Sequence, residues 1–205
     1  MENKKENLEK IFDFLHVVCD LKNAKRYGNY DIDADSSADH SWRLALMSFV
    51  ISDELKLDID KFKAMKIAIV HDLPEAITGD TPYMEILNGN VSKEEKQKNE
   101  ILAMKKMTEL LPEKIGEEII GLWEEYEYSK TKEGLFIKAL DKIETIAHVV
   151  EKGREYTDLD LIATYPDKHV KNFPELLPVL KELKKRLRKE FEKRGLVWKS
   201  EYDEY

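Results

Sequence analysis

The sequence contains only one cysteine, Cys19, so no disulfide bond can form within its 205 residues. A chain without a disulfide framework fits a reducing compartment, and we expect it to be cytoplasmic. Its first ten residues, MENKKENLEK, are polar and charged, unlike the apolar core of a secretory signal peptide. No apolar run approaches the roughly 20 residues that span a bilayer, so we expect no membrane association.

Helix-breaking residues and excess positive charge are also scarce. The chain has 8 glycines and 6 prolines, while 42% of its residues are hydrophobic and 37% are charged. This composition favours long helices with solvated faces and a sizeable core over a sheet protein. The formal net charge of −8 offers a polynucleotide no long-range attraction, so we expect no nucleic-acid partner. A small phosphate ester remains compatible, because a bound cation can reverse the local field.

Apolar residues recur at helical spacing in seven segments. The expected helices cover residues 4–22, 38–56, 60–71, 93–111, 112–128, 132–153 and 175–194. Ser36 or Ser37 can cap the second helix, and Ser92 with Glu95 forms a capping box for the fourth. Pro74 lacks an N–H donor and should end or kink the third helix. The sequence therefore predicts an all-α protein.

The length favours a single domain. We expect residues 1–155 to form a helical-bundle core and residues 156–205 to form a connection and a C-terminal amphipathic helix. That last helix would pack on the core or at a dimer interface. The stretch between Pro166 and Pro178 is the one candidate linker.

His71 and Asp72 stand side by side at the end of the apolar segment KAMKIAIVHD. Burying a carboxylate there costs several kcal/mol unless it is paired or bound to a cation. Neutral imidazole and carboxylate are both good metal ligands, so a metal would solve this problem. The alternative is a helix-end histidine beside a capping or salt-bridging aspartate, because an isolated His-Asp pair is a weak motif.

Two further residues strengthen the case for a metal. His40 opens a helix that is otherwise rich in core residues, and Asp141 lies in the middle of the apolar segment FIKALDKIETIAHVV. Three helices thus offer two imidazoles and two carboxylates, which leaves room for waters in a six-coordinate site. Such a mixed set suits Mn, Co, Fe, Ni or Zn better than Mg.

Four segments resemble a known family in order and separation: SSADHSWRLALM, IVHDLPEAITGDTP, LWEEYE and FIKALDKIE. The order of a histidine, a His-Asp pair and a distant aspartate resembles the HD superfamily of metal-dependent phosphohydrolases. The surrounding residues resemble its 5′-deoxynucleotidase (YfbR-like) branch over about residues 8–155. This chain reads GDTP where the family pattern has GDITP, so the loop after Asp80 is one residue shorter. The resemblance implies an HD-type helical bundle and a homodimer.

The resemblance also implies roles for individual residues. Glu75 matches the catalytic acid beside the metal, Asp80 the aspartate that holds the sugar and helps reject a 2′-hydroxyl, and Arg26 the arginine that meets the phosphate. The implied ligands of one divalent metal are His40, His71, Asp72 and Asp141. From the residues alone, Glu75 could instead be a surface acid, Asp80 a turn former, and Arg26 a solvated loop residue.

The expected reaction is hydrolysis of a deoxyribonucleoside 5′-monophosphate, a small nucleotide substrate. A second hypothesis keeps the site but changes the substrate to a triphosphate, a cyclic dinucleotide or a guanosine polyphosphate. A third is a non-catalytic, metal-stabilised helical sensor or scaffold. For a homodimer, the helices at 112–128 and 175–194 could supply the surface.

The remaining histidines and several aromatic residues are expected to lie outside the metal site. His16 reads as a core or edge residue, His148 lies two helical turns after Asp141, and His169 looks exposed. Three aromatic residues could stack on a base but are more often core or interface residues: Trp42, Trp123 and Tyr126.

Overall fold

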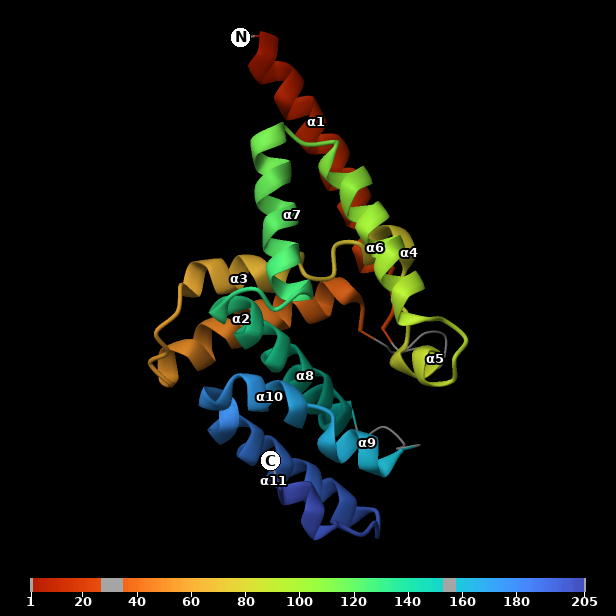
Figure 1. Ribbon diagram of the computed structural model, residues 1–205, viewed down its shortest axis with the longest axis vertical. Helices are drawn as coiled ribbons and strands as arrows, with labels where there is room; N and C mark the ends of the chain where they lie inside the picture. Colours follow the sequence, from red (N-terminus) through yellow and green to blue (C-terminus); the bar gives the residue numbers. More distant parts are fainter. Residues whose placement is uncertain (1, 27–34, 153–157, 205) are drawn as a thin grey trace.

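The computed structural model describes residues 2–26, 35–152 and 158–204, and these residues form helices and no strand (Figure 1). An isolated bridge joins Lys25 to Ser36. The all-α prediction is confirmed. The helices are α1 (Glu2–Val18), α2 (Ser37–Glu54), α3 (Lys61–Val70), α4 (Glu75–Thr78), α5 (Tyr83–Leu87), α6 (Lys93–Thr108), α7 (Glu113–Glu127), α8 (Lys132–Lys152), α9 (Leu159–Thr164), α10 (Asp167–Asn172) and α11 (Leu177–Lys193). Within the described ranges, short 3-10 helices accompany them: η1 (Cys19–Lys22), η3 (Pro174–Leu176) and η4 (Ser200–Asp203).

The seven predicted segments correspond to the long helices, and the short ones were missed. Helices α4, α5, α9 and α10 have four to six residues each. Elements of about one turn are too short to show an apolar repeat, so the periodicity that located the others could not find them. The stretch expected to be a linker after Pro166 in fact contains α10 and η3.

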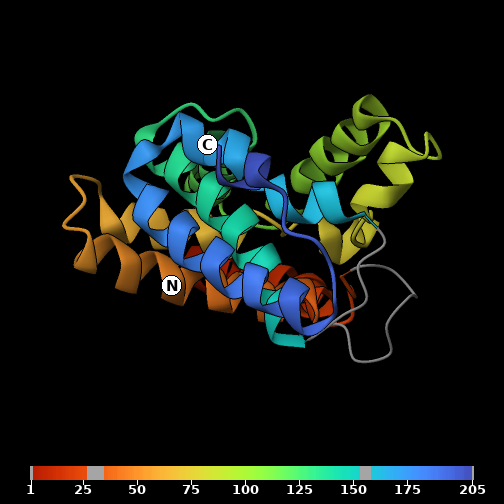
Figure 2. The same ribbon diagram turned by 90° about the horizontal axis from the view of Figure 1, so that it is seen from below.

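Helix α8 lies at the centre of the molecule. It contacts α2, α3, α7, α10 and α11, and Figures 1 and 2 show α10 and α11 lying along it. Its apolar residues Phe136, Leu140 and Ile143 are buried. Helix α11 is amphipathic and buries its apolar side within the chain, through Leu180, Leu183, Leu187 and Phe191.

The ends of two helices set the position of the site. Ser36 is the N-cap of α2, and it exchanges hydrogen bonds with Asp39 in a complete capping box. The cap leaves His40 in the first turn of α2. Helix α3 ends at Val70, and a turn through Pro74 follows before α4 begins at Glu75. Pro74 therefore interrupts the third helix as predicted.

Helices α1 and α6 contact each other, and in Figure 1 they extend upward, away from α10 and α11. Ser92 caps α6 by accepting a hydrogen bond from the backbone N–H of Glu95 at 3.0 Å. None of the helices in the described residues is long and apolar enough to cross a membrane.

Candidate active site

Three of the four predicted metal ligands converge where α2 meets the end of α3. His40, His71 and Asp72 each offer one ligand atom, and these atoms lie within 4.8 Å of one another. The Oδ2 atom of Asp72 is 3.1 Å from Nε2 of His71 and 3.8 Å from Nε2 of His40. Both imidazoles are buried. The arrangement is a compact cluster of nitrogen and oxygen ligands on two helices.

Asp141 joins this cluster from α8. Its Oδ1 atom lies 3.1 Å from Nε2 of His40. Its other oxygen, Oδ2, accepts hydrogen bonds from the Tyr126 hydroxyl at 2.6 Å and from Lys142 Nζ at 2.7 Å. Burial would raise the pKa of Asp141, but Lys142 and His40 hold it well below its usual value. The structure thus brings all four residues together, with one carboxylate oxygen of Asp141 facing the histidines.

The hydrogen bond made by Nδ1 of His71 determines whether its other ring nitrogen, Nε2, can bind a cation. Nδ1 of His71 is 2.8 Å from the carbonyl oxygen of Ala68, so Nδ1 must carry the proton that is donated. In the neutral ring, Nε2 then has only a lone pair. That atom is buried and has no hydrogen-bond partner among the described residues. Asp72 lies 3.1 Å away but is also an acceptor. A divalent cation would satisfy both, so the donor set fits a metal.

His40 is held from its other side by Glu144, which the sequence reasoning missed. Nδ1 of His40 lies 2.6 Å from Oε2 of Glu144. Burial and the Arg26 guanidinium lower the pKa of His40, but Asp141 and Glu144 outweigh them and raise it to about 9. In the metal-free protein a proton on His40 therefore balances the surrounding carboxylates. The signal that could have found Glu144 is the one that found Asp141, an acid inside an apolar helical segment.

Arg26 lies beside the site, and its guanidinium contacts α8. It donates hydrogen bonds to Oε2 of Glu144 and to Oγ1 of Thr145, both at 3.0 Å. Its side chain is mostly buried. The structure therefore places this residue next to a carboxylate that holds His40, and it is not a solvated loop residue.

Glu75 opens α4 and is buried. Its Oε2 atom accepts a hydrogen bond from the Ser37 hydroxyl at 2.5 Å. Burial, followed by the charges of Asp72 and Asp80, raises the pKa of Glu75 well above its usual value. A buried carboxyl group with a raised pKa beside a cluster of ligands can act as a proton donor. Glu75 is thus not an ordinary surface acid.

Asp80 is half-buried and close enough to raise the pKa of Glu75. It follows Gly79, whose φ of 70° is a conformation that favours glycine. Lys96 of α6 also faces this region. Burial lowers the pKa of Lys96, but the carboxylates of Glu100, Glu75 and others raise it above its usual value. The sequence reasoning did not single out Lys96.

The other histidines lie outside the ligand cluster. His148 is buried, with its Nδ1 atom 2.8 Å from Asp35 Oδ2. His16 is exposed and is not a core residue. His169 is half-buried, whereas the sequence predicted exposure, and burial followed by Lys142 and Lys138 lowers its pKa to about 4.

Of the aromatic residues considered for stacking, Trp123 and Tyr126 are buried. The Tyr126 ring packs edge-on against His71, with 4.9 Å between the ring centroids. Tyr126 therefore packs against the ligand cluster through His71. Trp42 is exposed.

The chain is similar to known proteins of one family. A profile of the HD domain matches residues 18–172. The human protein 5′-deoxynucleotidase HDDC2 is 37% identical over 153 residues, which cover 73% of this chain and 70% of that one. The 5′-deoxynucleotidase hdd1 of Schizosaccharomyces pombe is 38% identical, covering 71% of this chain and 74% of the relative.

Solved structures have the same fold. A protein described as a predicted metal-dependent phosphohydrolase, from Magnetospirillum magnetotacticum, superposes with a TM-score of 0.76 at 21% identity, covering 95% of this chain and 98% of that one. A conserved hypothetical protein from Pyrococcus furiosus superposes with a TM-score of 0.66 at 29% identity, covering 85% and 99%. The chain therefore belongs to the HD-domain family of metal-dependent phosphohydrolases, among the relatives of the curated 5′-deoxynucleotidases.

Proposed function

We propose that this chain hydrolyses deoxyribonucleoside 5′-monophosphates to the nucleoside and phosphate. The observation that carries the proposal is a buried carboxyl group with a raised pKa, Glu75, beside convergent ligands for a cation. A metal that only stabilised the fold would need no such acid. The names of the relatives, 5′-deoxynucleotidases in human and in fission yeast, support the choice of substrate.

One divalent metal would be held by a set of two imidazoles and two carboxylates, His40, His71, Asp72 and Asp141. Such a set suits Mn, Co, Fe, Ni or Zn better than Mg alone. When bound, the cation supplies positive charge that stabilises the phosphoryl group in the transition state. The lone pair of His71 Nε2 supports its inclusion, because it is buried without a hydrogen-bond partner among the described residues.

The protein's own residues would bind and protonate the substrate. Glu75, held by the Ser37 hydroxyl, would give its proton to the leaving 5′-oxygen. Asp80 would accept a hydrogen bond from the sugar. Arg26 would approach the phosphate with its planar guanidinium, which matches phosphate geometry. The position of Asp80 near Glu75 supports the sugar assignment, because the 5′-oxygen and the sugar ring are neighbours.

Two other hypotheses remain to be separated from this one. The same site could act on a triphosphate, a cyclic dinucleotide or a guanosine polyphosphate, or the chain could be a sensor or scaffold that retains a metal. The raised pKa of Glu75 favours an enzyme. The net charge of −8 disfavours bulky polyphosphates, which carry several negative charges.

A screen of nucleotides against metals, with released phosphate as the readout, tests the proposal. We expect turnover of deoxynucleoside monophosphates with Mn, Co, Fe, Ni or Zn. Turnover confined to triphosphates or cyclic dinucleotides would support the second hypothesis. No turnover with any pair would support the scaffold.

The sugar assignment has its own test. Values of kcat/KM for matched deoxy- and ribonucleoside monophosphates should differ in the parent enzyme, and Asp80→Ala should reduce the difference. A site built for one hydrogen-bonding pattern discriminates strongly, because a mismatched substrate leaves buried polar groups unpaired. Equal efficiency on both sugars in the parent would rule out this role of Asp80.

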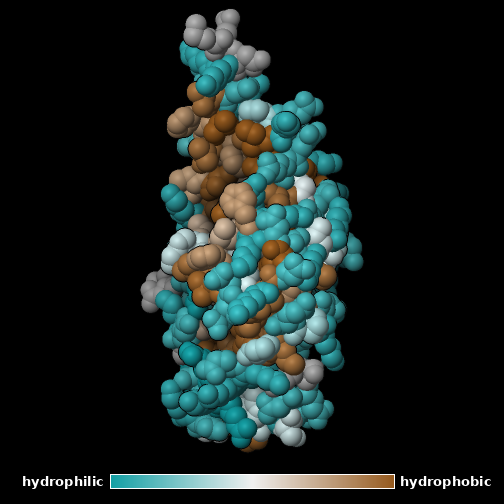
Figure 3. Space-filling view, turned by 90° about the vertical axis from the view of Figure 1, so that its left-hand side faces the viewer, coloured by the Kyte–Doolittle hydropathy of each residue, from teal (hydrophilic) through white to brown (hydrophobic). Residues whose placement is uncertain are grey.

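We also propose a cytoplasmic homodimer. Leu8, Phe12 and Leu15 recur along one side of α1 and are exposed, Phe12 to 70%. Figure 3 shows apolar side chains gathered in the upper half of one face of the molecule. Apolar patches of this kind on a soluble chain mark interaction surfaces. The apolar side of α11 is buried within the chain, so it offers no such surface.

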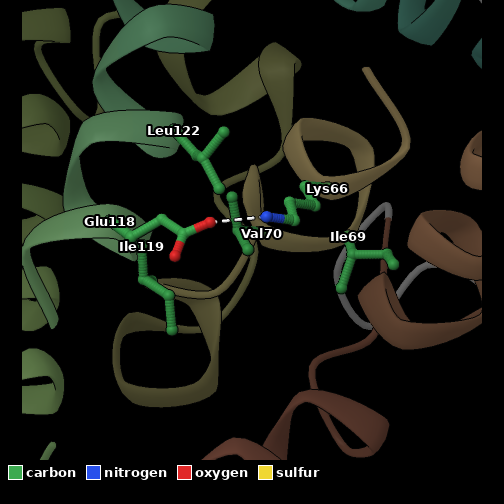
Figure 4. Close-up of a pocket in the computed structure, with 6 residues that line it drawn as sticks. All are labelled: Lys66, Ile69, Val70, Glu118, Ile119 and Leu122. Carbon is green, nitrogen blue, oxygen red and sulfur yellow. Dashed lines mark hydrogen bonds and ion pairs between the residues drawn. The ribbon is translucent and has the colours of Figure 1, made fainter. Parts of the chain in front are cut away.

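A shallow cavity also lies between α3 and α7 (Figure 4). Its volume is 270 Å³, and an ion pair between Lys66 and Glu118, at 2.5 Å, crosses it. The other lining residues are Ile69, Val70, Ile119 and Leu122. Sedimentation velocity should show a dimer for the parent chain and a weaker one for Phe12→Asp. Val197→Asp, which changes an exposed residue near the C-terminus, should sediment like the parent. A monomeric parent at micromolar concentration would contradict the dimer.

A further inference from the structure

The carboxylate of Glu144 is the most enclosed acid of the site, with no exposed surface. Its Oε2 atom receives two close contacts, from His40 Nδ1 at 2.6 Å and from the Arg26 guanidinium at 3.0 Å. Its Oε1 atom has no hydrogen-bond partner in the described part of the chain, and the Arg43 guanidinium lies 3.6 Å from it. The mechanism proposed above gives Glu144 no role.

The geometry of these contacts differs from that of a bidentate ion pair. An arginine and a carboxylate frequently pair through both oxygens. Here Arg26 and His40 share one oxygen, and the other is left without a hydrogen bond. Burying a carboxylate in this way is costly, because its desolvation is only partly offset by its partners. The shorter of the two contacts is the one to His40.

We propose that Glu144 is a positioning residue for His40, and that Arg26 holds Glu144 in place for this task. By accepting a hydrogen bond from Nδ1, Glu144 fixes the ring of His40 so that Nε2 faces Asp72 and Asp141, where its lone pair becomes available to a cation once the proton on Nε2 leaves. A ligating histidine needs such a partner for its second nitrogen, which fixes the ring and raises its basicity. The inference rests on the metal-dependent function proposed above.

The two ligating histidines are held by different kinds of acceptor. Nδ1 of His71 is bonded to the backbone carbonyl of Ala68, which no substitution can remove. Nδ1 of His40 is bonded to the side chain of Glu144 on α8, 104 residues later in the sequence. The support of His40 can therefore be removed by mutation while that of His71 stays intact.

The test is the affinity of the metal-free protein for Co²⁺ or Mn²⁺, measured by competition with a chelator and without substrate. Glu144→Gln keeps the shape of the side chain but removes its charge. We expect its metal affinity to fall about 10- to 100-fold, the usual effect of losing such a partner. The visible spectrum of the Co²⁺ form should change as well, because the ring of His40 is no longer fixed. Unchanged affinity and an unchanged spectrum would overturn the proposal.

Glu151→Gln is the matched control. Glu151 lies on the same helix, and it pairs with Arg43 at 2.8 Å without contacting His40. Its substitution should leave metal affinity and the Co²⁺ spectrum as in the parent. If Glu151→Gln weakens metal binding as much as Glu144→Gln does, the effect belongs to the charge of the helix and the proposal is wrong.

Two more variants keep the test decisive if Glu144→Gln does not fold. Glu144→Asp retains the charge that pairs with Arg26, so it should fold. Its side chain is too short to hold His40 as closely, so its metal affinity should be lower than that of the parent. Arg26→Gln should also weaken metal binding, though less, because Glu144 remains. If Arg26→Gln raises KM while metal affinity is unchanged, Arg26 serves the substrate and does not hold Glu144.

These measurements do not depend on the substrate. A loss of metal affinity in Glu144→Gln supports the inference even if the screen finds no hydrolysis of deoxynucleotides. Hydrolysis with unchanged metal affinity would refute the inference and leave the proposed function intact.

Discussion

Helix α8 has two buried faces of opposite character. One face is apolar and includes Phe136, Leu140 and Ile143, and the ring of Phe136 packs against Phe173, which directly follows α10. Toward α2 and α3 the helix buries Asp141 and Glu144, together with the histidines that they contact. Both faces belong to the same helix and both are buried. Comparing them therefore distinguishes residues that stabilise the fold from residues that we propose take part in the reaction.

The apolar face stabilises the fold. Burying a leucine or phenylalanine side chain contributes roughly 1.5–3 kcal/mol, and α11 adds several such residues. The polar face contributes far less, because the desolvation of a buried charge largely cancels its attraction to a partner. A protein keeps such a face for a function that needs charge, and we propose that here this function is the binding of a cation.

The largest difference between the two faces is expected when a proposed metal ligand is removed. Asp72→Ala and His71→Ala should each abolish metal retention and activity, because the remaining ligands no longer close the site. The apolar face is untouched, so the circular dichroism spectrum should remain helical. Elemental analysis of the purified variants decides the matter. A stoichiometric metal in either variant would show that the ligand set is wrong.

Removing the acid separates chemistry from metal binding. Glu75→Ala and Glu75→Gln should retain the metal but lose about 10²- to 10⁴-fold in rate, the usual contribution of a positioned acid or base. The loss should fall on kcat, since a proton transfer matters in the transition state and little in the ground state. Steady-state kinetics and metal analysis are measured on the same samples. Departure of the metal with Glu75 would make it a ligand.

A substitution in the apolar core around α8 and α11 should lower stability and leave the catalytic rate unchanged. Leu180 of α11 is fully buried, and Leu180→Ala should lower the free energy of unfolding by about 2–5 kcal/mol. The rate per folded molecule should stay that of the parent, because the residue is not part of the site. Urea denaturation and kcat at low temperature test both halves. A large fall in kcat would mean that the two faces are coupled.

The smallest expected effect is a pH-dependent gain in stability. The pKa of Glu75 is raised in the folded protein, so the stability that its proton contributes is fully present below about pH 4.5 and is lost as pH rises through the folded value. Glutamine does not titrate. Glu75→Gln should therefore melt higher than the parent at pH 8, with each 1 kcal/mol worth roughly 2–4 °C. Thermal unfolding of metal-free protein at pH 4.5 and 8 is the measurement. An equal difference at both pH values would contradict the raised pKa.

The sequence alone determined the long helices and the types of residue at the site. Apolar repeats and capping residues act within one or two turns, so they could be read without a fold, as for Ser36 at α2 and Pro74 after α3. Buried acids in apolar segments pointed to Asp72 and Asp141 for the same reason.

Only the tertiary structure decided which groups hold these residues in place. The contacts of Glu144 with His40 and Arg26 join positions 104 and 118 residues apart, and no local pattern encodes them. The short helices α4, α5, α9 and α10 likewise depend on packing, because a single turn is not stable by itself. The raised pKa of Glu75 is a property of its burial beside Asp72 and Asp80, and it exists only once the chain has folded.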